Sequence, residues 1–267
     1  YETYNVEMRL SGYEVLEIQN VQIFAEESSY LPLHPTPTRR QVFPGRSVSN
    51  IVDHHLLTNY GGNNQGQTPA NLGRILGQVT IPTYITVHLG RPQNAAENVT
   101  VPFLYYLKNV ACSEIYPTWP YEALKANIWA QASLALNRIY TEWYPGQGYD
   151  FDITNSTAFD QAFVKDRNIF DSVAVVVYEV FNQYIQKANY QEPYYAEYCD
   201  GKIASCPGMK QWGTLSLANQ GYTAIEILRY YYGDSILIRE SNNIQDIQAS
   251  YPGVLRIGSS GQEVREM

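Results

Sequence analysis

The stretch CSEIYPTWPYEALKA, residues 112–126, contains the transition that organises this chain. Thr118 is a suitable N-cap and Pro120 fits a first helical turn, so a helix is expected to begin near Thr118. Apolar residues then recur at helical spacing, at Leu124, Ile128, Ala132, Ala135 and Ile139. The run Tyr144-Pro145-Gly146 is expected to end the helix.

Glu114 lies in this turn, among aromatic residues and prolines, just before the expected helix. A carboxyl group that rings shield from water is poorly solvated, which favours its neutral form and raises its pKa. Glu114 is therefore a candidate general acid, a side chain that gives a proton to a leaving group. The simpler interpretation is that Glu114 only favours the positive end of the helix dipole.

The rest of the chain predicts an α+β fold: a mixed or antiparallel sheet with about three packed helices, preceded by a small all-β segment. Residues 1–33 and 76–112 alternate as strands do. Further helices are predicted over residues 168–187 and 223–233, the second with Thr223 and Glu226 as a capping box.

Three regions follow from this pattern. Residues 1–75 form a β segment and a loop rich in Pro, Gly and Asn; the basic part of this loop, with Arg39-Arg40 and Arg46, could be a processing site or an ordered lid. Residues 76–240 form the main domain. Residues 241–267 form a linker and a further, incomplete segment.

Composition excludes several partners. The net charge is −8 and no basic run could neutralise phosphates, so neither nucleic acid nor an anionic membrane surface is expected to bind. No stretch approaches the ~20 apolar residues of a membrane span. The 24 tyrosines offer flat faces with a hydroxyl, which suit sugar rings but also fill half-buried structural positions.

Cysteine and histidine usage leaves two questions. Cys112, Cys199 and Cys206 allow either a Cys199–Cys206 disulfide or three free thiols. The pair His54-His55 has only Asp53 at ligand spacing, so neither a metal nor a cofactor is expected.

Three separated segments carry a further pattern. They are Ser113-Glu114-Ile115 with Trp119-Pro120 and residues 122–126; Tyr149-Asp150-Phe151-Asp152 leading to Gln161; and residues 208–214 followed by Leu217-Ala218, Gly221, Ile227-Leu228 and Tyr231-Tyr232-Gly233. In order and spacing they resemble the catalytic domain of the stage II sporulation protein D family, over roughly residues 76–240. The likeness is greatest to spore cortex-lytic enzymes, which act during germination.

The resemblance implies an organisation and a location. In those enzymes a propeptide precedes the domain and a peptidoglycan-binding repeat follows it. Residues 1–75 would then be propeptide-like or the remnant of a sandwich, and residues 251–267 are similar to the opening of such a repeat. An extracytoplasmic place in the spore cortex or cell wall and an activating protease are also implied.

Several positions depart from the family pattern. Ser205-Cys206 stands where the family usually has His-Gly, and Lys210 replaces a Ser. Some members bind zinc through a His-Cys pair just before the position of Gln161. Here that pair is Phe159-Asp160, so this metal is expected to be absent. Ala132-Ser133-Leu134 stands where Arg-Thr-Tyr is often found.

The activity that the resemblance implies is that of a lytic transglycosylase, a lyase that cuts peptidoglycan between N-acetylmuramic acid and N-acetylglucosamine and closes a 1,6-anhydro ring. Glu114 would act first as acid and then as base, so one carboxyl group suffices where ordinary glycosidases need two. The candidate substrate-binding residues are Tyr116, Trp119, Tyr198, Gln211 and Trp212; Trp212 could instead be a core residue.

Two other functions compete with this interpretation. The chain could be a non-catalytic protein that binds or scaffolds wall glycan, with Glu114 structural; a related alternative is a zymogen whose residues 1–75 cover the cleft until they are cut. A cysteine peptidase built on Cys112, with His88 or His54 as base, is the weaker rival, because a thiol at a strand end is commonly just buried.

Overall fold

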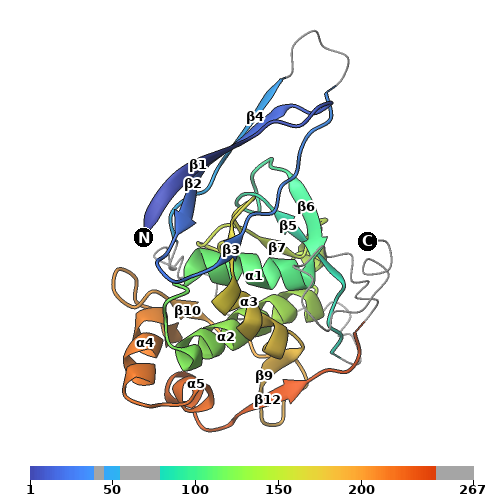
Figure 1. Cartoon of the computed structure of the whole chain (residues 1–267). Helices are drawn as coiled ribbons and strands as arrows, with labels where there is room; N and C mark the ends of the chain where they lie inside the picture. The colour runs from blue at the N-terminus through green and yellow to red at the C-terminus, as the bar shows by residue number, and fades with distance from the viewer. Residues whose placement is uncertain (39–44, 55–78, 245–267) are drawn as a thin grey trace.

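The computed structural model describes residues 1–38, 45–54 and 79–244 (Figure 1). It contains helices and several small sheets of mixed strand direction, so the predicted α+β class is confirmed. The basic pair Arg39-Arg40, His55 and the repeat-like residues 251–267 lie outside the described residues. Within the described ranges, no helix is both long and apolar enough to cross a bilayer.

The N-terminal part is a three-stranded sheet in the order β1-β2-β4; two of its strands lie in the predicted β segment, whereas β4 lies in residues that were expected to form a loop. Strand β1 (Glu2–Met8) pairs antiparallel with β2 (Val15–Ile23), which pairs parallel with β4 (Arg46–Asn50). A small apolar cluster of its own contains Leu16, Ile18, Val21 and Ile51. The sheet extends away from the helical body, and β3 (Ser29–Tyr30) returns to that body by pairing antiparallel with β8 (Ile169–Phe170) (Figure 1).

Two consecutive helices, α1 (Phe103–Glu114) and α2 (Tyr121–Tyr140), form the centre of the body. Both are buried on almost all sides, as helices covered by other elements are. Alanine occupies many positions of α2, and small side chains allow neighbouring helices to approach closely. The helices that pack against α2 besides α1 are α3 (Asp171–Val180), α4 (Gln211–Asn219) and α5 (Ala224–Tyr232).

Small sheets surround these helices. Strand β5 (Tyr84–His88) lies between antiparallel β6 (Asn98–Pro102) and parallel β7 (Ile153–Thr154). Strand β9 (Gln183–Lys187) pairs antiparallel with β12 (Ile236–Glu240). Strand β10 (Tyr198–Cys199) pairs parallel with β11 (Met209–Lys210). A short 3₁₀ turn, η1 (Pro145–Gln147), follows α2.

The structure corrects three local predictions and confirms one. Residues 103–112 were expected to continue a strand but belong to α1, so Glu114 ends one helix instead of lying in a turn before the next. The helix expected to begin near Thr118 begins at Tyr121, after Pro120. The helix predicted over residues 168–187 is divided among β8, α3 and β9. The capping box of Thr223 and Glu226 is present at the start of α5.

Candidate active site

Glu114 is the last residue of α1, and its side chain is completely buried, with 0% of its surface exposed. Pro117 disfavours the helical conformation at Tyr116, the residue before it, so the helix cannot continue far past Glu114. The next residue, Ile115, is already extended, with φ of −124° and ψ of 154°. The carboxyl group at the end of α1 therefore lies in the interior of the helical body.

Three donors hold the Glu114 carboxyl group, each from a different part of the chain. Oε2 accepts hydrogen bonds from Gln131 Nε2 and from the Tyr198 hydroxyl, both at 2.8 Å. Oε1 accepts the backbone N–H of Ala162 at 2.8 Å. Among the described residues, no cationic side chain forms an ion pair with it.

The pKa of Glu114 is set by two opposing effects. Burial is the larger effect and raises the pKa, because a charged carboxylate loses its hydration; the net result is a rise from 4.5 to about 7. The hydrogen bonds from Ala162, Tyr198 and Gln131 act in the opposite direction, because they stabilise the ionised form. The balance leaves a carboxyl group that can both give and take a proton near neutral pH, which is what an acid that later acts as a base requires.

A chain of buried hydrogen bonds continues from Tyr198. Its hydroxyl accepts a hydrogen bond from Gln161 Nε2 at 2.8 Å, and Gln161 Oε1 accepts one from the Tyr106 hydroxyl at 2.8 Å. Gln161 Nε2 also donates to the backbone carbonyl of Gln131 at 3.1 Å. Burial raises the pKa of both Tyr198 and Tyr106 well above the usual range, so both hydroxyls stay protonated and act as donors.

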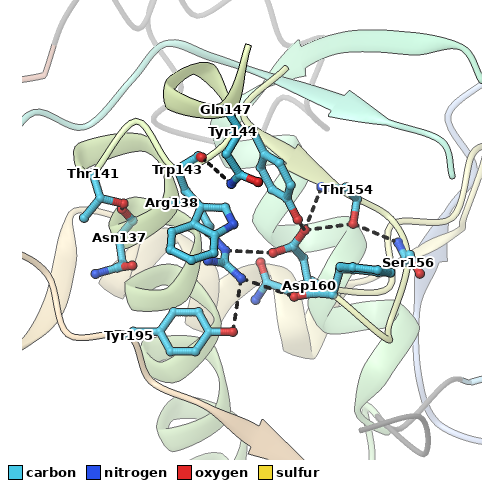
Figure 2. A network of polar contacts seen from close by, with 12 residues as sticks. Asn137, Arg138, Thr141, Trp143, Tyr144, Gln147, Thr154, Ser156, Asp160 and Tyr195 are labelled. Carbon is cyan, nitrogen blue, oxygen red and sulfur yellow. Dashed lines mark hydrogen bonds and ion pairs between the residues drawn. The ribbon is translucent and has the colours of Figure 1, made fainter. Parts of the chain in front are cut away.

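A buried ion pair anchors the segment that carries Gln161 and Ala162. Arg138 Nε donates to Asp160 Oδ1 at 2.8 Å, and the two side chains are almost fully buried (Figure 2). Asp160 Oδ2 also accepts hydrogen bonds from the Tyr144 hydroxyl and from the Thr154 backbone and hydroxyl. Asp160 thus serves as a structural anchor at the position where the resembled family carries part of a zinc site in some members.

The three predicted aromatic residues come together in space: Tyr116 and Trp119 follow Glu114 closely in the sequence, and Trp212 joins them from α4. The ring centroids of Tyr116 and Trp119 are 5.9 Å apart, those of Tyr116 and Trp212 are 5.8 Å apart, and those of Trp119 and Trp212 are 5.1 Å apart. Tyr116 and Trp212 are half-buried, whereas Trp119 is buried. The Lys202 ammonium lies 3.3 Å from the Trp212 ring centroid, a cation–π contact.

The other two predicted binding residues lie in the interior. Tyr198 is 4% exposed and contacts the acid itself, as described above. Gln211 is fully buried at the start of α4 and does not belong to the hydrogen bonds of Glu114. Two further carboxylates are held by backbone groups: Asp152 accepts the N–H of Thr86 in β5, and Asp200 accepts the N–H groups of residues 203 and 204, as turn residues do.

The N-terminal part docks beside this site through Arg167, which is fully buried. Its guanidinium donates to Gln22 Oε1 at 2.6 Å, to the Val52 carbonyl at 2.5 Å and to the Ser113 hydroxyl at 3.2 Å. The first two acceptors belong to the N-terminal part, and the third precedes Glu114 in α1. One cation therefore joins the N-terminal part to the end of the helix that carries the acid.

Aromatic contacts complete this docking. The His54 ring stacks on Tyr116, with centroids 4.6 Å apart and an angle of 12° between the planes. Phe24 meets the same ring edge-on at 6.3 Å. The side chain predicted to line a sugar-binding cleft is therefore in contact with residues of the N-terminal part.

The remaining cysteine and histidine expectations now have a structural context. Cys199 and Cys206 form a disulfide, with Cα atoms 6.1 Å apart. Cys112 is a free, buried thiol in α1 whose pKa burial raises to about 12, which argues against a nucleophilic role. The ring of His88 is held by hydrogen bonds with the Asn98 side chain of β6 and with two backbone carbonyls of the loop between β5 and β6. Within the described ranges, no cluster of three or more His, Cys, Asp or Glu residues could bind a metal ion.

Sequence reasoning missed the donors Gln131 and Ala162 and the position of Tyr106. Gln131 did leave a signal, because it is a polar residue within the alanine-rich run of α2 and is 1% exposed in the fold. Its Oε1 atom is buried and has no hydrogen-bond partner among the residues that the structure describes. An unpartnered acceptor beside the acid is available to a donor group of a ligand.

The fold and this site define an α+β protein with one buried carboxyl group that titrates near neutral pH. No model of a known protein family matches the chain, and no curated protein is significantly similar to it.

Proposed function

We propose that this protein is a lytic transglycosylase of spore cortex peptidoglycan, with Glu114 as its catalytic residue. The observation that carries the proposal is the carboxyl group of Glu114, which is buried and held by three donors and whose pKa is raised to about 7. The segments that resemble the stage II sporulation protein D family support it, since they include this Glu.

The proposed reaction needs no second carboxylate. Protonated Glu114 donates to the glycosidic oxygen while the bond from that oxygen to C1 of the muramoyl residue breaks. The muramoyl C6 hydroxyl then forms a bond to C1, and its proton passes to the Glu114 carboxylate. The acid is regenerated and a 1,6-anhydro end is left. A water-excluding, aromatic surrounding favours this internal closure over hydrolysis.

The aromatic cluster of Tyr116, Trp119 and Trp212 is the proposed sugar-binding surface. Aromatic faces pack against the apolar CH faces of pyranose rings, and the half-buried rings of Tyr116 and Trp212 are suited to this contact. The free Oε1 atom of Gln131 could accept a hydrogen bond from a sugar N–H or O–H group.

We further propose that the chain with its N-terminal part attached is a zymogen. Glu114 is completely buried, and His54 and Phe24 contact Tyr116, so glycan cannot reach the acid in this arrangement. An activating protease would be the expected partner. Turbidity loss of purified cortex should be slow before limited proteolysis near Arg39-Arg40 or Arg46 and faster after it; equal rates would contradict this part of the proposal.

The complete burial of Glu114 also favours a second candidate, a protein that binds wall glycan without cutting it. A buried carboxyl group with three hydrogen bonds can be purely structural. This candidate predicts binding to purified sacculi with no loss of turbidity, before or after proteolysis.

Product analysis decides between these functions. Mass spectrometry of digested cortex should show 1,6-anhydromuramoyl ends in samples treated with the active protein and none in samples treated with Glu114→Gln. Reducing ends would mean hydrolysis and would call for a second carboxylate. Activity equal to wild type in Glu114→Gln would remove Glu114 from the reaction.

A further inference from the structure

The two oxygens of Glu114 are not equivalent. Oε2 accepts two hydrogen bonds, from Gln131 Nε2 and the Tyr198 hydroxyl, whereas Oε1 accepts one, from the Ala162 N–H. Each oxygen of a carboxylate has two lone-pair positions for such bonds. Oε2 therefore has both positions filled, and Oε1 has one position open.

The direction of the Tyr198 hydrogen bond is fixed by its neighbours. The backbone carbonyl of Gln131 can only accept, so the Gln161 amide must present Nε2 to it, and the opposite orientation would place two acceptors together. The same Nε2 donates to the Tyr198 oxygen, while Tyr106 donates to Gln161 Oε1. The single hydroxyl proton of Tyr198 is thereby directed at Glu114.

We infer that Glu114 carries its transferable proton on Oε1, and that Gln131, Tyr198 and Gln161 are positioning residues that keep Oε2 a permanent acceptor. The catalytic meaning of this inference rests on the proposed function. In the reaction the Oε1–H bond breaks as the glycosidic oxygen is protonated, and the C6 hydroxyl proton later returns to Oε1. The charge that develops on the carboxylate meets donors that are already in place, so no reorganisation is needed.

The positioning role is tested by titrating the carboxyl group directly in the full chain. Infrared difference spectra of protein with ¹³C-labelled glutamate, assigned by the loss of the band in Glu114→Gln, give the midpoint of ionisation. Tyr198→Phe and Gln131→Met each remove one donor to the charged form, so each should raise the proton affinity about tenfold or more. Gln131→Met leaves no protein donor unpaired, which makes it the safer variant for folding. Tyr105→Phe, on the helix that carries Glu114, is the matched control and should leave the midpoint of ionisation unchanged.

The same spectra identify the oxygen. If the proton is on Oε1, the C=O group of the acid form is C=Oε2 and receives two hydrogen bonds. Removing one of them should then move its stretching band to higher frequency in both variants. A band that stays in place would mean that the proton is on Oε2, and an unchanged midpoint would mean that these side chains do not set the proton affinity; either result overturns the inference.

Failure of the proposed function has a different signature. In protein activated by proteolysis, kcat/KM for cortex cleavage should fall at high pH as Glu114 ionises, which gives its pH profile a high-pH limb. In Gln131→Met this limb should move to higher pH together with the infrared midpoint. If the midpoint moves and this limb does not, the inference about the proton holds and Glu114 is not the catalytic acid.

Discussion

Replacing Glu114 by Gln should change how the stability of the protein depends on pH. The carboxyl group titrates near 4.5 in an unfolded chain, and burial raises its pKa to about 7 in the fold. Between these values the folded state binds more protons than the unfolded state, so the free energy of unfolding falls as pH rises. The stability that Glu114 contributes is complete below its unfolded pKa and is lost as pH rises through about 7. An amide does not titrate and removes this dependence.

The magnitude follows from the same two values. A tenfold change in proton affinity is worth about 1.4 kcal/mol, so a rise from 4.5 to about 7 is worth about 3 kcal/mol. Most of it, about 2–3 kcal/mol, is lost between about pH 5 and about pH 8. The amide has a further cost at every pH. With its oxygen in the Oε2 position, its NH₂ faces the Ala162 N–H, and this donor–donor contact should cost about 1–3 kcal/mol.

Urea unfolding of wild type and Glu114→Gln at about pH 5 and about pH 8 measures both effects. The variant should be the less stable protein at about pH 5, and the gap should shrink by about 2–3 kcal/mol at about pH 8. Glu97→Gln is the control, because the Glu97 side chain is exposed. A gap of the same size at both pH values would refute the reasoning, since Glu114 would then titrate alike in the folded and unfolded states.

Three further changes test the surroundings of the site. Asp160→Asn leaves the Arg138 guanidinium buried without its carboxylate and should lower the free energy of unfolding by about 3–5 kcal/mol in urea; a loss under about 1 kcal/mol would contradict a dry ion pair. Arg167→Leu removes the cation that holds the N-terminal part, so limited proteolysis of that part should be faster at unchanged helix content, and an unchanged rate would count against the docking role. Replacing Cys199 and Cys206 by Ser opens a loop with a sequence separation of 7 and should cost about 2–3 kcal/mol; equal melting temperatures for the variant and wild type would argue against the disulfide as a stabilising link.

The sequence predicted the α+β class. It also indicated Glu114 as a candidate, because the prolines and aromatic residues near this carboxyl group are its neighbours in the sequence. It did not predict α1. The alternation of Val99, Val101 and Phe103 continues from a strand into this helix, which has Pro102 before it, no side-chain cap and no acidic first turn, so the usual start signals are missing.

Long-range pairing explains the other errors. The apolar spacing of residues 168–187 suits one helix, but β8 and β9 are strands because β3 and β12 pair with them from distant parts of the chain. The donors of Glu114 have the same origin. They lie 17, 48 and 84 residues further along the chain, and no local pattern specifies such contacts.

These separations have a consequence for the newly made chain. A half-folded molecule lacks Gln131, Ala162 and Tyr198 around the carboxyl group, which then ionises like any glutamate in water. Its pKa rises to about 7 only when these distant segments have assembled and the carboxyl group is buried. If Glu114 is the catalytic acid that we propose, a newly made copy gains its acid only when its folding is complete.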